Sequence, residues 1–110
     1  MELLQFTMTG TAHSAGFKRF KDMIKAGDRL ELQRDPTNAY DQGAIKVLYD
    51  GEHIGWVPKK LGEAKLMLDR LLEFDFQYIG VQTTVEMHET DNPVDMQLIV
   101  KVELFEFEAD

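Results

Sequence analysis

The stretch that decides the fold lies in the middle of the chain and reads Ile45-Lys46-Val47-Leu48-Tyr49-Asp50-Gly51-Glu52-His53-Ile54-Gly55-Trp56-Val57. Apolar side chains recur at every second position before Asp50-Gly51, which is typical of a half-buried strand. A two-residue hairpin turn needs positive φ angles, and glycine adopts them without steric cost. The stretch therefore predicts a β-hairpin, with strands over residues 45–49 and 53–57.

The N-terminal part of the chain predicts one strand followed by one helix. Apolar and polar residues alternate up to Gly10, as expected of a strand, and the apolar members are Leu4, Phe6 and Met8. After a small, polar loop over residues 11–16, apolar side chains recur at helical spacing until the pattern stops at Gly27. The members of this helical face are Phe17, Phe20 and Ile24.

The rest of the chain predicts three further strands and a second helix. A strand over residues 29–33 and a turn-rich loop over residues 37–43 precede the hairpin. Pro58 opens the helix, where its missing N–H is harmless, and the core face is Leu61, Ala64, Leu68, Leu71 and Leu72. Two long strands follow over residues 77–88 and 96–107. Their apolar faces are Ile79, Val81, Thr83, Val85 and Met87 in the first strand, and Leu98, Val100, Val102 and Leu104 in the second.

Six strands and two helices without a strand–helix–strand rhythm predict one mainly β domain, α+β by content, over residues 1–110. We expect a small antiparallel barrel or curled sheet. The chain has 110 residues, 44% of them hydrophobic, and no cysteine, which excludes disulfides and thiolate metal sites. The N-terminus lacks the pattern of a signal peptide, and no apolar run reaches the roughly 18 residues of a membrane helix. We therefore expect a cytoplasmic protein with no membrane partner.

The charge of the chain is unevenly distributed. The formal net charge is -8, which argues against a broad basic surface for nucleic acid. Residues 1–70, however, hold 11 of the 12 basic and 10 of the 20 acidic residues, and residues 71–110 hold one base and ten acids. Because the acidity belongs to the C-terminal third, any anion-binding face must come from the first 70 residues.

Two segments carry a resemblance to a known family. They read Leu32-Gln33-Arg34-Asp35-Pro36-Thr37-Asn38-Ala39-Tyr40-Asp41-Gln42-Gly43-Ala44-Ile45-Lys46-Val47 and Gly51-Glu52-His53-Ile54-Gly55-Trp56-Val57-Pro58-Lys59. The sequence resembles the HIRAN domain, and the resemblance covers nearly all of residues 4–73. In DNA-translocating ATPases that remodel stalled replication forks, this domain is an OB-like barrel that captures the 3′-hydroxyl end of single-stranded DNA. It is also a free-standing small protein in bacteria and phages.

The resemblance implies a nucleic-acid-binding site and a role in DNA repair or replication-fork processing. Asp41 would accept a hydrogen bond from the free 3′-hydroxyl, and Tyr40 would stack on the terminal base. Lys59, assisted by Lys60, would pair with a backbone phosphate, and Trp56 is a second possible stacking surface. The implied partners are single-stranded DNA 3′ ends and other DNA-processing proteins.

Two more positions belong to the predicted site, and two depart from the family pattern. Arg34 lies in the matched core, and His13 stands in the first loop where the DNA-binding members have an aromatic residue. Ala12 stands where those members carry arginine, and Gly43 replaces an asparagine of the core. These departures leave open a second reading, in which the fold is kept and the DNA site is lost.

The residues of the predicted site also have structural interpretations. Asp41 can cap the turn that follows Tyr40, and Trp56 can pack in the core. Arg34 and Asp35 can form an ion pair that fixes the loop. The two lysines after Pro58 can form a solvated surface at a helix N-terminus, where their charge opposes the helix dipole.

Catalytic patterns are lacking in the sequence. The three histidines, His13, His53 and His88, are far apart and belong to three different predicted elements, so a zinc site is not expected. No phosphate-binding glycine loop and no nucleophile elbow are found. We interpret the chain as a non-enzyme without cofactor or metal: a module for single-stranded DNA ends, or alternatively a protein-interaction or regulatory module with the same fold.

Overall fold

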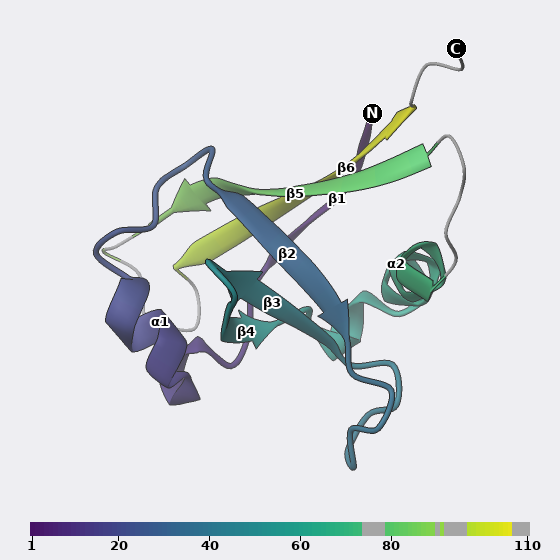
Figure 1. Cartoon of the computed structure of the whole chain (residues 1–110), viewed down its shortest axis with the longest axis horizontal. Coiled ribbons are helices and arrows are strands. Elements are labelled where there is room, and N and C mark those ends of the chain that lie inside the picture. The colour runs from purple at the N-terminus through teal and green to yellow at the C-terminus, as the bar shows by residue number, and fades with distance from the viewer. Residues whose placement is uncertain (74–78, 90, 92–96, 107–110) are drawn as a thin grey trace.

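A computed structural model describes residues 1–73, 79–89, 91 and 97–106 of the chain, without the side chains of residues 79 and 106. Six strands and two α-helices make up the fold (Figure 1). In chain order the elements are β1 (Glu2–Thr7), the 3-10 helix η1 (Thr11–His13), α1 (Ala15–Phe20), β2 (Arg29–Arg34), β3 (Ile45–Tyr49), β4 (Glu52–Trp56), the 3-10 helix η2 (Lys59–Leu61), α2 (Glu63–Glu73), β5 (Ile79–His88) and β6 (Leu98–Glu106). This content confirms the predicted mainly β fold class.

The strands form one antiparallel sheet in the order β1-β6-β5-β2-β3-β4. β2 turns the corner of this sheet. Its first two residues, Arg29 and Leu30, pair with β5, whereas residues 31–34 pair with β3. The sheet therefore curls, and the hairpin of β3 and β4 folds over the long hairpin of β5 and β6.

The curled sheet closes at one end through a single bridge between its two edges. Beyond the end of β1, the Thr9 N–H donates to the carbonyl of Trp56 at 3.0 Å, and the Trp56 N–H donates to the carbonyl of Thr9 at 2.8 Å. This bridge makes the sheet a half-barrel rather than an open sheet. It also places the end of β4 beside the first loop of the chain.

The predicted turn of the central hairpin is confirmed. Asp50 and Gly51 both have positive φ angles, of 50° and 80°, as the two-residue primed turn requires. β3 and β4 pair as predicted, although the register shifts by one residue between Val47 and Leu48.

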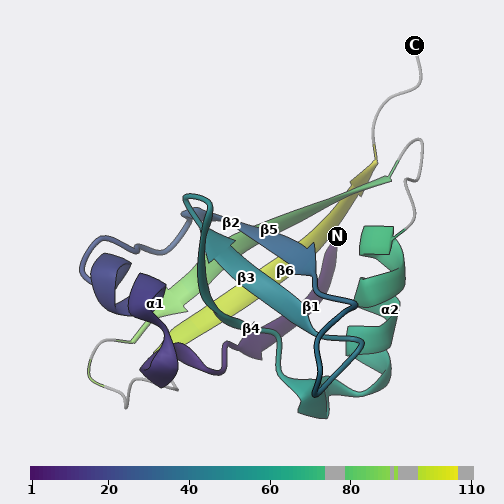
Figure 2. The same cartoon turned by 60° about the horizontal axis from the view of Figure 1, so that its bottom comes forward.

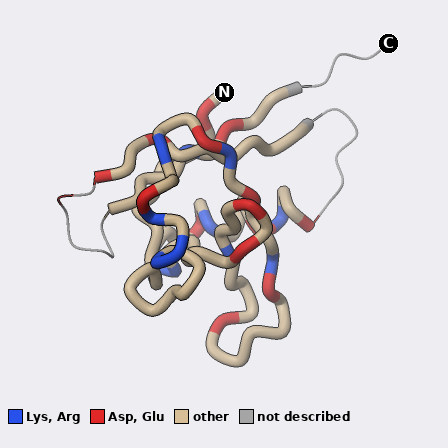
Figure 3. The backbone as a smooth tube through the Cα atoms, turned by 60° about the vertical axis from the view of Figure 1, so that its left-hand side comes forward, with Lys and Arg blue, Asp and Glu red and all other residues tan. Residues whose placement is uncertain are grey.

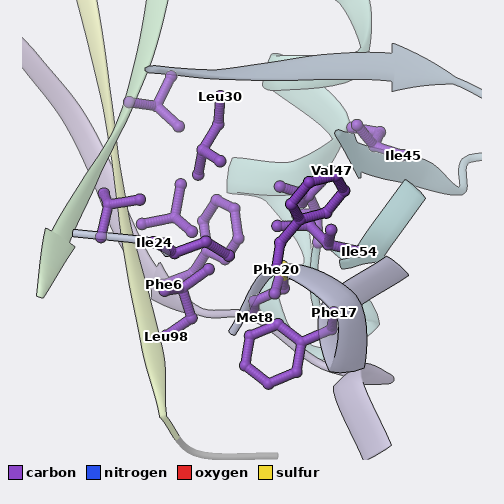
Figure 4. Close-up of a cluster of buried hydrophobic side chains, with 14 of the residues drawn as sticks. Phe6, Met8, Phe17, Phe20, Ile24, Leu30, Ile45, Val47, Ile54 and Leu98 are labelled. Atoms are coloured by element: carbon purple, nitrogen blue, oxygen red, sulfur yellow. The ribbon is translucent and has the colours of Figure 1, made fainter. Parts of the chain in front are cut away.

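The core lies between the curled sheet and the two helices, which cover opposite ends of the sheet (Figures 1 and 2). Phe17 and Phe20 of α1 enter this core together with strand residues from the whole sheet (Figure 4). The buried members are Phe6, Met8, Phe17, Phe20, Ile24, Leu30, Ile45, Val47, Ile54, Val57, Leu68, Val85, Leu98, Val100 and Val102. Every strand contributes at least one side chain, so the predicted apolar faces do build a common core.

The two predicted helices differ in their bounds from the structure. α1 begins at Ala15, inside the predicted loop, and ends at Phe20, so Ile24 is buried from a following turn. Pro58 opens the 3-10 helix η2, and the left-handed Gly62 (φ 59°) separates η2 from α2. The pattern of apolar residues did not distinguish these short turns from a continuous helix. In the described part of the chain, no helix is long and apolar enough to cross a membrane.

The two long strands pair as predicted, with one correction. A β-bulge between Val85 and Met87 shifts the register against β6. One extra residue in a strand changes the face that the following side chains occupy. Met87 is therefore exposed and does not share the buried face of Val85. The predicted strand positions 77, 78, 96 and 107 lie outside the described residues.

Gly55 is placed where the chain after β1 crosses β4 most closely. A Cβ atom at this position would lie 2.6 Å from the Met8 Sδ and 2.8 Å from the Thr9 carbonyl oxygen. Met8 is fully buried and Thr9 forms the closing bridge. Moving either residue away would therefore disrupt the core packing of Met8 or the hydrogen bonds of Thr9. The close approach that closes the sheet thus requires glycine at this position.

We expect Gly55→Ala to lower the free energy of unfolding by about 1–3 kcal/mol or more, because the new methyl group overpacks against buried atoms and backbone. Urea unfolding followed by circular dichroism measures the change. Gly43→Ala is the matched control, because its Cβ would meet its nearest neighbours at an ordinary 3.5 Å, and its effect should stay within about 1 kcal/mol. Equal stability of the two variants would contradict this account of the closure.

Candidate functional site

A shallow depression of about 320 Å³ lies at the end of the sheet where the bridge closes it. Four segments surround it: the residues after β1, the loop between β2 and β3, the end of β4, and η2. The lining residues are Thr9, Gly10, Asn38, Tyr40, Asp41, Ala44, Trp56, Val57 and Lys59. Four of the seven predicted site residues, Tyr40, Asp41, Trp56 and Lys59, therefore meet at one place.

The loop between β2 and β3 is held by hydrogen bonds within itself. The side-chain oxygen of Asn38 accepts from the backbone N–H groups of Tyr40 at 2.9 Å and Asp41 at 3.0 Å. The base of the loop is closed by the Asp35 N–H, which donates to the Ala44 carbonyl at 2.9 Å. These bonds fix the backbone around Tyr40, so the main chain that carries its ring is ordered before any ligand arrives.

The two aromatic residues of the depression differ in exposure. Tyr40 is 93% exposed, so its ring projects into solvent. Trp56 is half-buried, and its indole contacts the edge of the His53 ring with 4.6 Å between centroids. Trp56 thus combines the packing role and the lining role that the sequence left as alternatives. The floor between the two rings is apolar, because Ala44 and Val57 are buried there.

The carboxylate of Asp41 is anchored on both oxygens. Oδ1 accepts a hydrogen bond from the Gly43 N–H at 3.0 Å, which is the turn cap considered from the sequence, and Oδ2 accepts from the Lys65 Nζ at 2.6 Å. The hydrogen bond from Lys65 lowers the pKa of Asp41 below its ordinary value of 3.8, and the charges of Lys65 and Lys59 act in the same direction. Asp41 is therefore ionised at neutral pH.

Lys65 is the residue of this site that the sequence analysis missed. It comes from α2, and it is only 7% exposed. It lies four residues after Leu61 and three before Leu68, on the predicted core face of the helix. A lysine at a core position of an amphipathic helix signals a buried partner of opposite charge, and this signal was available in the sequence.

The other predicted site residues do not line the depression. Arg34 binds Asp69 of α2, with Nε donating to Oδ1 at 2.9 Å, and it lies 3.9 Å from Glu73. Arg34 thus pairs with a residue of α2 and not, as the sequence had suggested, with the neighbouring Asp35. Lys60 is exposed and lines a different shallow depression with residues of β1. His13 is exposed at the end of η1.

His53 lies under Trp56 and adds no charge to the rim. Burial lowers its pKa below 6.5, and the charge of Lys46 adds to this effect, while the hydrogen bond with the Gly55 carbonyl partly opposes it. The neutral ring can donate from Nε2 to that carbonyl at 2.8 Å. The cationic side chain that lines the depression is therefore that of Lys59.

Basic and acidic residues are interspersed along the described backbone (Figure 3). Within the described ranges, no three His, Cys, Asp or Glu residues gather closely enough to hold a metal ion. The charged residues that line the depression are Asp41 and Lys59.

The chain matches a known protein family. The family model described as HIRAN domain matches residues 1–103. The chain is similar to the helicase-like transcription factor of Oryctolagus cuniculus, with 33% identity over 66 residues, and to that of Homo sapiens, with 36% identity over 53 residues. These alignments cover 57% and 47% of this chain but 7% and 5% of the relatives, so the chain spans a small part of their length.

Two solved structures share the fold. The crystal structure of the HIRAN domain of human HLTF superposes with a TM-score of 0.65 at 22% identity, covering 97% of this chain and 79% of that domain. A protein from Lactobacillus plantarum superposes with a TM-score of 0.64 at 17% identity, covering 94% of this chain and 95% of that protein. The fold is thus the OB-like half-barrel that the sequence analysis expected.

We expect a carboxyl NMR titration to give Asp41 a pKa below 3.8, and Lys65→Met to move that pKa back toward the ordinary value, because the hydrogen-bonded ammonium is removed. Since the folded-state pKa is the lower one, the unfolded state binds more protons between the two values. The contribution of Asp41 to stability is then complete above the unfolded-state pKa and is lost as the pH falls through the folded-state pKa. Lys18→Met, on the exposed face of α1, should leave the Asp41 titration unchanged. An Asp41 pKa that does not respond to Lys65→Met would contradict the pairing.

Proposed function

The chain belongs to the HIRAN domain family, a family of DNA-binding modules, and from this premise we propose that it captures the free 3′-hydroxyl end of single-stranded DNA. The observation that carries the proposal is that Tyr40, Asp41 and Lys59 line one depression. An aromatic face, a hydrogen-bond acceptor and a cation are the three groups that a terminal nucleotide can use. They come from two separate segments of the sequence, so their meeting is a property of the fold.

Asp41 supplies the group that distinguishes a chain end. Each carboxylate oxygen can accept two hydrogen bonds, and in Asp41 each already accepts one, from Gly43 or from Lys65. A 3′-hydroxyl can therefore donate to the remaining lone pair without breaking either bond. An internal nucleotide has no free 3′-hydroxyl, so it cannot make this contact.

Tyr40 and Trp56 supply stacking surfaces. The exposed ring of Tyr40 offers both faces to a base, and the half-buried indole of Trp56 offers a second surface across the apolar floor. Base stacking on an aromatic side chain contributes about 1–3 kcal/mol and does not depend on sequence. The proposed site is therefore selective for single strands rather than for a base order.

Lys59 supplies the phosphate contact, with Lys60 beside it on η2. A chain with a net charge of -8 gains little from long-range attraction, so we propose that binding is weak, in the micromolar range or above. Its salt dependence is modest, because one or two phosphate contacts release few counterions. Arg34 and His13 are assigned no direct contact in this proposal, because Arg34 is held by Asp69 and His13 does not line the depression.

We also propose a cellular role for the chain. We infer a non-catalytic module over residues 1–110 that acts in the cytoplasm on DNA ends during repair or replication-fork processing, together with other DNA-processing proteins. The family and the four clustered residues support the DNA end as the ligand. The departures from the family pattern at Ala12 and Gly43 instead favour an interaction module. Binding experiments with oligonucleotides distinguish these two functions.

We expect Lys59→Ala and Tyr40→Ala to weaken binding for different reasons. Lys59→Ala removes a phosphate contact, so all oligonucleotides weaken about equally and the salt dependence decreases by about one counterion. Tyr40→Ala removes stacking and costs about 1–3 kcal/mol. Fluorescence anisotropy with a labelled single-stranded oligonucleotide at low salt measures both effects, and Lys18→Ala controls for the loss of a positive charge elsewhere. If the wild-type protein binds no oligonucleotide at low salt, the DNA proposal is wrong and the interaction module replaces it.

We expect Asp41→Asn to reduce the preference for a 3′-hydroxyl over a 3′-phosphate, because it replaces the charged acceptor by a neutral amide while still offering an oxygen to Gly43. The measurement compares dissociation constants for the same strand with a hydroxyl, with a phosphate, and closed into a circle. Asp22→Asn makes the same charge change at an exposed position beyond α1 and should leave the preference intact. Equal binding of linear and circular strands by the wild-type protein would exclude end recognition.

A further inference from the structure

Lys65 is a buried cation at the base of the proposed site. Its Cα lies in α2, on the face that packs toward the sheet through Leu68, and its side chain is about nine-tenths buried. An ammonium removed from water is costly unless a partner of opposite charge and good geometry is present. The carboxylate of Asp41 is such a partner, with 2.6 Å between Nζ and Oδ2.

The pair lies beside Gly43. A Cβ atom at Gly43 would lie 3.5 Å from both the Lys65 Nζ and the Asp41 Oδ1, so the ammonium lies close to the backbone of the loop. Lys65 is buried and does not line the depression, whereas Asp41, Tyr40 and Lys59 do. A ligand in the depression therefore meets a carboxylate whose charge is already balanced by a buried ammonium.

This balance determines which end the site tolerates. A 3′-hydroxyl is neutral and needs only an acceptor, which the carboxylate offers with or without Lys65. A 3′-phosphate carries a charge of about -1.5 to -2 at neutral pH, and an unbalanced carboxylate in contact with it would repel it. With Lys65 paired to Asp41 and Lys59 lining the same depression, the three groups sum to one positive charge, so the repulsion is offset.

We propose that Lys65 is a specificity-determining residue, which tempers the preference of the site for a 3′-hydroxyl by neutralising Asp41 and so lets the same depression also accept 3′-phosphate ends. The inference rests on the proposed function, because it assigns the range of ends taken by that site. It concerns a residue that does not contact the nucleotide and acts through Asp41.

The test compares wild-type protein with Lys65→Met, which keeps the apolar stem and removes the charge. The quantity measured is the ratio of the dissociation constants for 3′-phosphate and 3′-hydroxyl forms of one labelled strand, at low salt. Removing one charge within a few ångströms of the terminal phosphate should raise this ratio by about tenfold, since charge pairs at this range interact strongly near a protein surface. Affinity for the 3′-hydroxyl form should change by less than about threefold, because its hydrogen bond to Asp41 remains.

Three further variants separate the effect of charge from that of structure. Lys65→Arg keeps the cation and should keep the wild-type ratio, and Lys18→Met makes the same chemical change on α1 and should also keep it. Lys65→Gln removes the charge but keeps a hydrogen-bond donor for Asp41. It should raise the ratio as Lys65→Met does, and it takes the place of that variant if urea unfolding shows that Lys65→Met is not folded.

The outcomes distinguish this inference from the function on which it rests. If both ends weaken equally in Lys65→Met and Lys65→Gln, Lys65 supports the loop without setting specificity, and the inference is wrong although the protein binds DNA. If the wild-type protein binds neither end, both the proposed function and this inference fail. A higher ratio in both charge-removing variants, with Lys65→Arg unchanged, supports the inference.

Discussion

The closing bridge between Thr9 and Trp56 is the constraint on which the remaining geometry depends. It joins the two edges of a six-stranded sheet with two hydrogen bonds, and it forms because Gly55 lets the chain after β1 approach β4 within contact distance. The bridge buries Met8 and turns the end of β4 toward the first loop. Without it, Thr9 and Gly10 would not meet the end of β4, and the depression would lose the side that the residues after β1 supply.

Helix α2 provides the second support of the site, through two ion pairs that reach the same loop from different sides. Arg34, at the end of β2, binds Asp69, and Asp41, within the loop, binds Lys65. Exposed ion pairs contribute little to stability, but both of these are half-buried or more. Their combined effect is to fix the loop between β2 and β3 against the helix, so that the rim of the depression belongs to the folded core.

The sequence was sufficient for the elements whose signal is local. The hairpin at Asp50-Gly51, the alternation along the long strands and the meeting of Tyr40 with Lys59, which followed from the family resemblance, all agree with the structure. What failed depends on contacts between distant segments or on single-residue shifts. The bulge before Met87 leaves no mark on an alternating pattern, and the partner of Arg34 lies 35 residues away on α2. The sequence places Lys65 on the core face of a predicted helix, but only the fold identifies Asp41 as its partner.

The contrast between the fixed backbone and the exposed ring of Tyr40 determines which groups the proposed nucleotide ligand would have to order. Asn38 already immobilises the main chain of the loop, so association restricts two side-chain torsions of the tyrosine rather than a whole segment. Ordering a backbone residue costs about 1–2 kcal/mol, and most of that cost is already met during folding. Under the proposed function, a strand would therefore dock onto a preformed rim, at a rate limited by diffusion and orientation and not by loop rearrangement.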